Sequence, residues 1–543
     1  MADFEFTPDQ KAAIESPLNL VITACPGSGK TSIVVEKIRR EIEELNSYQG
    51  VIGITFTVKA SNELRQRCKQ DGLNIKSSFF GTIDHFCLSE IIYPFISRLY
   101  GPSNNTLECK LYKDVDGDML TSLPNLIDIE NRLLAEHYKN YERDLKSLYA
   151  GGVILLESTG ILAGRILDES KACRNYIRAK YVSIYLDEYQ DSSEPQHKMF
   201  LKLLEMGLSG VAVGDIQQSI YAWRGSDPQY IQELIDNPNL FEHHIVDINH
   251  RCHPSITNYA NRLIEEDCPI QSVDELRVQQ WNVTGDQLMV AEQLNTVIAK
   301  VLEDKGVSSF SQVAILVRAN RSLDFLKSKI TLPYRIYSDD PLSLINTTVS
   351  KIMGGLISYR LDSNVLISEI LDMTVQYQSF TRVKKANIRS LVRSLRLCKE
   401  DELEQAIINV TEILLGDDFT GSETAALAAV LEDQNHLKQY RPIDDNEVQI
   451  MTLHKAKGLE FEIVFHLDLY DWVFPRRVFT GNFNEEIFSD WSQELNLHYV
   501  GITRAKECCV LVSSTQRINS SGETKQGFKS QFMTLPGLDG LYS

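Results

Sequence analysis

A short glycine-rich stretch carries the clearest chemical signal in the chain. It follows the β-favouring run LVI and precedes apolar residues at helical spacing. Such a strand, loop and helix bind phosphate, because the loop N–H groups curl inward and the helix adds the positive end of its dipole. We expect Lys30 to reach the terminal phosphates and Thr31 to bind Mg²⁺. The predicted binding residues are Ala24, Cys25, Pro26, Gly27, Ser28, Gly29, Lys30 and Thr31. The alternative is a glycine-rich turn without a ligand.

An acidic pair follows a second apolar run. Residues 181–186 read YVSIYL, which predicts a buried strand, and Asp187 and Glu188 come directly after it. In a nucleotide hydrolase the first carboxylate holds Mg²⁺, while the second orients and deprotonates the attacking water. An isolated acidic pair is commonly a turn or a helix N-cap. The phosphate-binding loop upstream makes hydrolysis the better interpretation.

Length and composition indicate what kind of domains hold these residues in place. A chain of 543 residues needs several compact units, and its composition of 43% hydrophobic and 24% charged residues is ordinary for globular domains. The net charge of −19 argues against a protein that coats nucleic acid by bulk charge, so any DNA contact is expected in a local groove.

Targeting signals and cysteine spacing bear on the compartment. We find neither an apolar stretch long enough to span a bilayer nor a signal peptide. The ten cysteines lack metal-binding or paired spacing and are interpreted as reduced thiols. We therefore expect a cytoplasmic protein without a membrane partner.

Two longer motifs point to a family. DEYQD at 187–191 and VAVGDIQQSIYAWRG at 211–225 resemble the superfamily 1 helicases of the UvrD/Rep/PcrA type. Further stretches follow in the order of that family: FTPDQKAAI (6–14), ITFTVKASNELRQR (54–67), FFGTIDHF (79–86), INHRCHPSI (248–256), VAILVRAN (313–320), PYRIY (333–337), MTLHKAKGLEF (451–461) and LHYVGITRA (497–505). The resemblance spans nearly the entire chain.

The resemblance implies a fold and cofactors. It predicts two RecA-like P-loop motor domains of the α/β class with parallel sheets, which use ATP and Mg²⁺. The intervals between the motifs are shorter than in a full UvrD-type helicase, so each motor should carry a reduced, mainly helical insertion. The expected ranges are 1–90 and 176–235 for the first motor, 91–175 for its insertion, 236–345 and 441–543 for the second motor, and 346–440 for its insertion.

The resemblance also implies roles at the nucleotide. Gln10 should read the adenine edge and Gln218 should sense the γ-phosphate. Arg251 and Arg504 correspond to the two arginines that approach the γ-phosphate from the second motor domain. The remaining contacts are Glu460 beside Gly458, expected at the ribose, and His250, which stands where the family places a stacking Tyr or Phe. The smaller ring puts nucleobase discrimination in doubt.

Single-stranded DNA is the implied track. Aromatic side chains suit it, because every base offers a face for stacking worth about 1–3 kcal/mol. The matching positions are Phe56, Thr57, Thr82, His85, Tyr221, Trp223 and His454. Core packing is the alternative for Tyr221 and Trp223, and plain turns are the alternative for both threonines.

One branch of the family is especially similar. The stretches FFGTIDHFCLSEIIYPFI (79–96) and YLDEYQDSSEPQHKMF (185–200), with the compact size, resemble the helicase-like subunit of Gabija anti-phage systems. This implies a Gabija nuclease partner, OLD-like with ATPase and Toprim parts, and recognition of DNA ends. The alternative is a free-standing UvrD-like repair helicase that translocates 3′ to 5′.

One basic segment lies outside these motifs. Residues 381–400, TRVKKANIRSLVRSLRLCKE, place Arg and Lys at steps of three and four beside an apolar face, which predicts an amphipathic helix. The basic face is either solvated or a contact for duplex DNA or an acidic partner.

Overall fold

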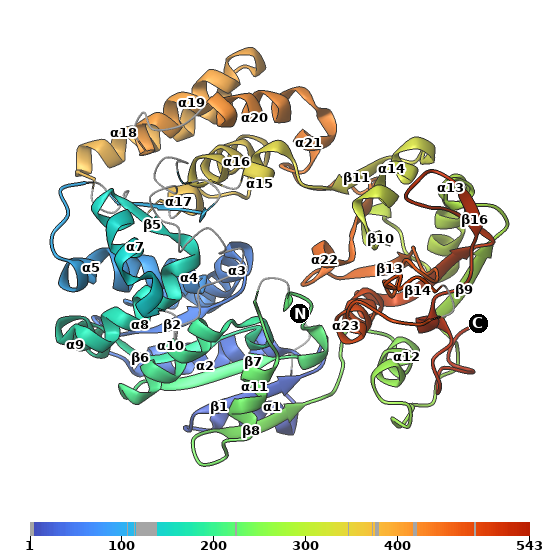
Figure 1. Cartoon of the computed structure of the whole chain (residues 1–543), viewed down its shortest axis with the longest axis horizontal. Coiled ribbons are helices and arrows are strands. Elements are labelled where there is room, and N and C mark those ends of the chain that lie inside the picture. The colour runs from blue at the N-terminus through green and yellow to red at the C-terminus, as the bar shows by residue number, and fades with distance from the viewer. Residues whose placement is uncertain are drawn as a thin grey trace. The chain divides into compact units, whose positions relative to one another are not determined.

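The chain folds into two compact units. The computed structural model describes residues 5–105, 107–112, 115, 138–222, 225–345, 347–371, 373–374, 380–415, 421–482 and 485–543. The units are Met1–His250 and Arg251–Ser543. Each contains a six-stranded sheet in which all neighbouring strands run parallel (Figure 1). The predicted pair of RecA-like α/β domains is therefore confirmed.

The sheet of the first unit brings distant segments side by side. Its strands, in spatial order, are β3 (Phe79–Gly81), β2 (Gly50–Ile54), β6 (Tyr181–Leu186), β7 (Ser209–Gly214), β1 (Leu20–Ala24) and β8 (Glu242–Val246). Side chains alternate along each strand, so Leu20 and Ile22 enter one hydrophobic cluster while Val21 enters the other. The sheet is thus covered on both faces, as a parallel sheet requires.

Helices cover those two faces. One cluster joins the sheet to α1 (Pro8–Glu15), α2 (Lys30–Glu44) and α3 (Val58–Cys68). The opposite cluster includes side chains of α4 (Ile83–Phe86), α8 (Thr159–Glu169), α9 (Lys171–Lys180), α10 (Glu194–Glu205) and α11 (Gln229–Ile235). The predicted strand at 181–186 and the helix after the glycine-rich loop are both confirmed as β6 and α2.

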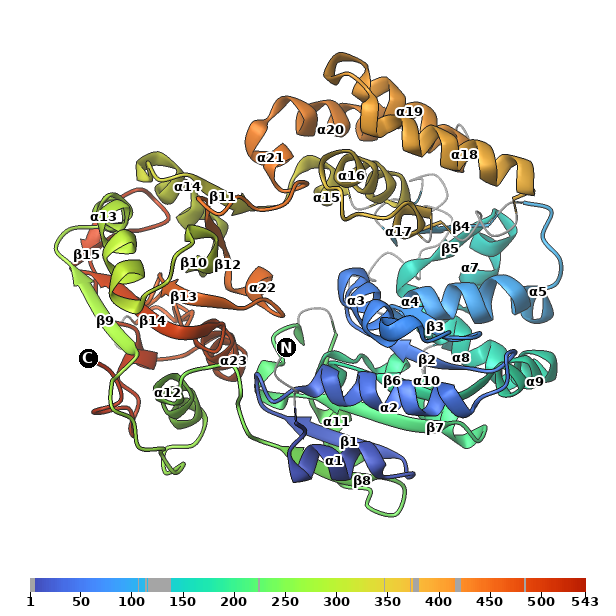
Figure 2. The ribbon, with the colours of Figure 1, turned by 180° about the vertical axis from the view of Figure 1, so that it is seen from behind.

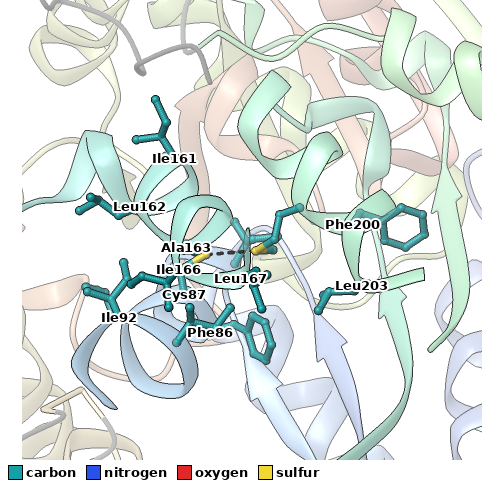
Figure 3. Close-up of a cluster of buried hydrophobic side chains, with 14 of the residues drawn as sticks. Phe86, Cys87, Ile92, Ile161, Leu162, Ala163, Ile166, Leu167, Phe200 and Leu203 are labelled. Carbon is teal, nitrogen blue, oxygen red and sulfur yellow. Dashed lines mark hydrogen bonds between the residues drawn. The ribbon is translucent and has the colours of Figure 1, made fainter. Parts of the chain in front are cut away.

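The first insertion shares a core with its sheet. Its remaining elements are α5 (Tyr93–Tyr100), α7 (Tyr138–Ala150) and a parallel pair, β4 (Glu108–Lys110) and β5 (Val153–Leu155). Figure 3 shows Ile166 and Leu167 of α8 beside Phe86 and Cys87, and the Sγ of Cys87 lies 3.4 Å from Sδ of Met199. This insertion therefore packs onto the sheet of the first unit rather than forming an independent core.

The second unit repeats the parallel architecture. Its sheet order is β11 (Tyr334–Tyr337), β12 (Val448–Thr452), β10 (Val313–Val317), β13 (Phe461–His466), β14 (Ala505–Ser514) and β9 (Val278–Val283). Side chains of α13 (Gln287–Lys305) and α14 (Asn320–Lys329) share its core, and α12 (Pro254–Ile264) and α23 (Trp491–Ile502) contact β14. A short helix, α22 (Leu453–Ala456), follows β12, and β15 (Gln516–Ile518) pairs with β16 (Thr524–Gln526) in an antiparallel hairpin.

The insertion of the second unit has its own helical core. It contains α15 (Pro341–Ile345), α16 (Thr348–Leu361), α17 (Ile367–Leu371), α18 (Arg382–Ser394), α19 (Glu400–Leu415), α20 (Gly421–Glu432) and α21 (Gln434–Lys438). Buried side chains such as Leu356, Ile388 and Leu427 belong to one cluster and join α16, α18 and α20. Figure 2 shows the ribbons of these helices. The basic amphipathic helix predicted within 381–400 is α18.

The boundary between the units differs from the predicted one. The prediction ended the first motor at residue 235, whereas β8 pairs with β1 along Leu20–Ala24. The first unit accordingly runs to His250. Among the described residues, no helix is long and apolar enough to cross a bilayer.

Candidate nucleotide and nucleic-acid site

The glycine-rich loop has the backbone of a phosphate cradle. Gly27 and Gly29 have φ values of 72° and 80°, which a residue with a Cβ adopts only at a cost. The buried Ser28 donates its hydroxyl hydrogen to the Cys25 carbonyl at 2.8 Å. The Cys25 N–H in turn donates to Val246 of β8 at 3.1 Å. The loop is therefore anchored between β1 and β8, with Lys30 and Thr31 as the first residues of α2.

Lys30 is directed back across the loop. Its Nζ donates to the Ala24 carbonyl at 3.5 Å and lies 3.8 Å from Oδ2 of Asp215, which follows β7. The Lys30 side chain is 11% exposed and the Asp215 side chain 2%. Burial raises the pKa of Asp215, while the positive charge of Lys30 opposes the rise. The ammonium group thus neutralises a buried carboxylate.

Asp187, the predicted metal ligand, directly follows β6. Its backbone N–H donates to Ile54 of β2 at 2.9 Å. Part of the Asp187 side chain stays accessible. Burial raises the pKa of Asp187 to about 6, and the negative charge of Glu188 contributes to the rise. The positive charge of Lys30 and a hydrogen bond from Thr31 oppose it. A carboxylate beside a hydroxyl is an all-oxygen donor set, which fits Mg²⁺.

Glu188 has an unusual backbone. Its φ of 57° and ψ of 43° lie in the left-handed region, which is uncommon for a residue with a side chain and clusters at functional sites. Gln190 donates from Nε2 to Glu188 Oε2 at 2.5 Å and accepts at Oε1 from the Asp215 N–H at 3.0 Å. Gln190 therefore fixes the Glu188 carboxylate relative to the end of β7.

The structure adds residues that the sequence-based prediction missed. Gln218, the predicted γ-phosphate sensor, donates from Nε2 to Oδ2 of Asp215 at 2.5 Å. The same carboxylate oxygen lies 3.8 Å from Nζ of Lys30, so Asp215 connects the two side chains. Asp215 and Gln190 were not predicted, although both stand in the quoted motifs and each follows a parallel strand. Position at the carboxyl end of a parallel strand was the available signal.

Two further predicted contacts lie against the loop. Gln10 is fully buried, donates from Nε2 to the Ser28 carbonyl at 2.8 Å, and accepts from the Thr7 N–H at 2.8 Å. His250 donates its backbone N–H to the Gly27 carbonyl at 3.0 Å, and its side chain is exposed. Gln10 therefore supports the loop, and the roles of both residues toward a nucleobase stay predictions.

Glu460 joins two cations in the second unit. Its carboxylate pairs with Nε of Arg251 at 2.7 Å and with Nζ of Lys506 at 2.8 Å. Burial alone would raise the pKa of Glu460, but Lys506 and Arg251 lower it overall. Gly458 turns the chain before it with a φ of 82°. Glu460, the predicted ribose contact, is therefore paired with Lys506 as well as with Arg251, and Lys506 was not predicted.

Arg504 is buried, with 1% of its surface exposed. Its Nε and Nη1 donate to the carbonyls of Val500 and Leu459, both at 3.1 Å, and Nη2 donates to the Thr503 hydroxyl at 3.3 Å. These bonds hold the guanidinium at the end of α23. The expected roles of Arg251 and Arg504 at a γ-phosphate stay predictions.

The residues predicted to contact DNA lie after strands. Phe56 follows β2, and its ring stacks on Tyr221 with centroids 4.9 Å apart and an interplanar angle of 13°. Thr57 caps α3 by accepting from Ala60, and Thr82 caps α4 by accepting from the N–H of His85. In the second unit His454 lies on α22, at the end of β12. Trp223 lies outside the described residues.

Comparison with known proteins gives a consistent result. The sequence model of the UvrD/REP helicase N-terminal domain matches residues 6–147 and 106–239, and the model of the UvrD-like helicase C-terminal domain matches residues 347–516. Gabija protein GajB of Bacillus cereus (strain VD045) is 27% identical over 93% of this chain and 95% of that protein. ATP-dependent DNA helicase PcrA of Staphylococcus epidermidis is 24% identical over 95% of this chain and 84% of that protein. ATP-dependent DNA helicase Rep of Buchnera aphidicola is 25% identical over 92% of each chain.

Proposed function

Because the chain belongs to the UvrD-like helicase family, we propose that it is a DNA-dependent ATPase that binds single-stranded DNA or DNA ends and hydrolyses ATP. The observation that carries this proposal is the convergence of Lys30, Asp187 and Asp215 at the carboxyl ends of three strands. Ligands bind at that edge of parallel sheets, where strand order brings separate loops together.

The proposed chemistry is attack of water on the γ-phosphate. The loop N–H groups and Lys30 bind the phosphates, and Glu188 accepts the proton of the attacking water. Thr31 and Asp187 would hold Mg²⁺, which neutralises phosphate charge when it is bound. Gln190 supports this role, because its bond to Glu188 and its bond to the Asp215 N–H prevent the carboxylate from turning away.

The proposed DNA track uses the stacked pair Phe56 and Tyr221. Both side chains are partly exposed, so a base can add to or separate the stack. Thr57, Thr82 and His85 lie after neighbouring strands of the same sheet and can contact the DNA backbone. His454 is the corresponding candidate of the second unit.

We further propose that the chain acts as the helicase-like subunit of a Gabija-type defence complex with a nuclease partner. Its match to GajB covers nearly all of both proteins, whereas 84% of PcrA is covered. The alternative is a free-standing repair helicase that moves 3′ to 5′, which the similarity to PcrA and Rep supports.

Phosphate release from ATP, measured with and without a single-stranded oligonucleotide, tests the motor proposal. We expect DNA to stimulate hydrolysis by the parent chain and Lys30→Met to abolish it. The matched control Lys11→Met removes an exposed lysine from the same unit and should leave hydrolysis unchanged. Absence of hydrolysis by the parent, alone and with its nuclease, would contradict the proposal.

A translocation assay distinguishes the free-standing helicase from the subunit of a Gabija-type complex. Displacement of a protein block from single-stranded DNA by the isolated chain would favour the free-standing helicase. Co-purification with the product of a neighbouring nuclease gene, with ATP hydrolysis that depends on it or on DNA ends, would favour the Gabija-type complex.

A further inference from the structure

A cavity of about 420 Å³ lies in the helical insertion of the second unit. It is bordered by the end of α16, the loop before α17, and α18. Its lining includes Tyr359, Ser363, Leu366, Arg389, Arg393 and Arg396. The cavity shares no residue with the glycine-rich loop, and its size is that of small-ligand sites.

Three guanidinium groups line this one cavity. Arg396 is fixed in place: Nη1 donates to the Asp362 carbonyl at 2.7 Å, Nη2 donates to the Val365 carbonyl at 3.0 Å, and the guanidinium carbon lies 4.0 Å from the centroid of Tyr359. Arg389 and Arg393 are exposed. Among the described residues, no carboxylate forms an ion pair with any of the three arginines.

The nearby acids are directed to backbone groups. Asp362 accepts from the Asn364 N–H at 2.8 Å, and Glu369 of α17 accepts from the Leu366 N–H at 3.3 Å. Each of these carboxylates thus accepts a backbone N–H of a local turn. In a chain of net charge −19, the cavity is therefore a local concentration of positive charge.

We propose that this cavity binds a phosphomonoester group, carried by a free nucleotide or by the phosphorylated end of a nucleic-acid strand. Planar guanidinium groups donate paired hydrogen bonds to phosphate oxygens, and the hydroxyl of Ser363 adds another donor. Val365, Leu366 and Ile367 provide an apolar wall for the organic part of the ligand. This site goes beyond the proposed ATPase and does not depend on it.

Charge favours a monoester over the other acidic groups. Three positive charges in one cavity repel each other, and a phosphomonoester brings about −1.5 to −2 at neutral pH. An internal phosphodiester or a protein carboxylate brings a single negative charge. The lining contains arginine and no lysine, as suits bidentate recognition of one compact anion.

Binding measurements on the full chain test the site. The background variant Lys30→Met removes the phosphate contact of the glycine-rich loop. The probes are thymidine 5′-monophosphate and one fluorescent single-stranded oligonucleotide prepared with a 5′-phosphate or a 5′-hydroxyl. Arg393→Gln and Arg389→Gln change exposed residues of the cavity, and Lys399→Gln is the matched control, because it removes an exposed charge outside the lining.

We expect each arginine variant to weaken binding of a phosphorylated probe by about tenfold, the loss of one charge-assisted contact. The control variant and the hydroxyl-ended strand should be unaffected. Binding of the mononucleotide would identify a free nucleotide, and binding of the phosphorylated strand alone would identify a strand end.

Three results would overturn the proposal. Equal binding of phosphorylated and hydroxyl-ended strands by the parent would show that the chain does not recognise a terminal phosphomonoester. Equal weakening of both strands by Arg393→Gln would assign the arginines to internal phosphates of DNA. Unchanged binding of the phosphorylated probes in both arginine variants would show that this cavity does not bind the phosphomonoester. ATP hydrolysis is measured in parallel, so failure of the motor proposal is recognised separately.

Discussion

Nζ of Lys30 lies 3.8 Å from Oδ2 of Asp215, so the lysine of the glycine-rich loop neutralises a buried carboxylate at the end of β7. Lys30→Met should therefore destabilise the first unit by about 1–3 kcal/mol at pH 8, because Asp215 is left buried without a cation. Burial raises the pKa of Asp215, so protonation should reduce this loss at pH 5.5.

A double-mutant cycle measures that coupling. Thermal unfolding of Lys30→Met, Asp215→Asn and the double variant should show that Asp215→Asn restores most of the stability lost in Lys30→Met. Additive effects of the two substitutions, at both pH values, would contradict the pairing.

The stack of Phe56 on Tyr221 predicts a selective DNA defect. Tyr221→Ala should weaken binding of single-stranded DNA by about 1–3 kcal/mol, because one stacking surface is lost. Fluorescence anisotropy with an oligonucleotide checks this, and Tyr48→Ala, an exposed tyrosine of the same unit, is the control. ATP affinity should stay unchanged in both variants. If Tyr221→Ala and Tyr48→Ala bind DNA equally well, the Tyr221 ring packs against Phe56 without contacting DNA.

Some of this arrangement could be predicted from the sequence. The run YVSIYL predicted β6 to the residue, because a central parallel strand is covered on both faces and is therefore mostly apolar. Strand β8 was missed, because EHHIV is polar in part and pairs with β1 from far along the chain. The prediction could not place Asp215 beside Lys30, since their contact depends on the order of β7 and β1 in the sheet.

The same limit applies to the second unit. Family resemblance identified Glu460 and Arg251, but not Lys506, which reaches Glu460 from the start of β14. Burial of Arg504 under the end of α23 is likewise a property of tertiary packing, and a basic residue in sequence is usually taken to be solvated.

A buried histidine pair predicts acid sensitivity of the second unit. His498 Nδ1 lies 3.0 Å from His466 Nε2, and both side chains are fully buried. Burial lowers the pKa of His466 to about 4 and also lowers the pKa of His498. In the unfolded chain both histidines titrate near their ordinary value of about 6.5. Below that pH the unfolded chain binds protons that the folded unit does not, so the free energy of unfolding is greatest above about pH 6.5 and falls as the pH falls toward 4.

Thermal unfolding between pH 7.5 and 4.5 checks this effect. Each histidine should contribute a slope of up to about 1.4 kcal/mol per pH unit. His498→Phe should reduce the slope even if it changes the stability at pH 7.5, and His436→Phe, which changes a partly exposed histidine outside the buried pair, is the control. An identical slope in the parent and in His498→Phe would contradict the assignment.

Cys25 provides a chemical probe of the loop. Its thiol donates to the Asp247 carbonyl at 3.1 Å and is partly accessible. Alkylation by N-ethylmaleimide should block nucleotide binding, because the adduct would fill the loop, and bound ATP should protect the thiol. Mass spectrometry locates the adduct. Cys25→Ala should retain ATP binding and lose the sensitivity, and persistent inactivation of that variant would place the reactive thiol elsewhere.

The most direct test of the proposed ATPase compares ATP binding with ATP hydrolysis in Glu188→Gln. Gln190 holds the Glu188 carboxylate at 2.5 Å beside Asp187, and an amide cannot accept the proton of the attacking water. The variant should bind ATP as the parent does while DNA-stimulated turnover falls by about 10²-fold or more. Glu205→Gln, an exposed glutamate of the same unit, should match the parent in both measurements. Undiminished hydrolysis by Glu188→Gln would contradict the assigned role.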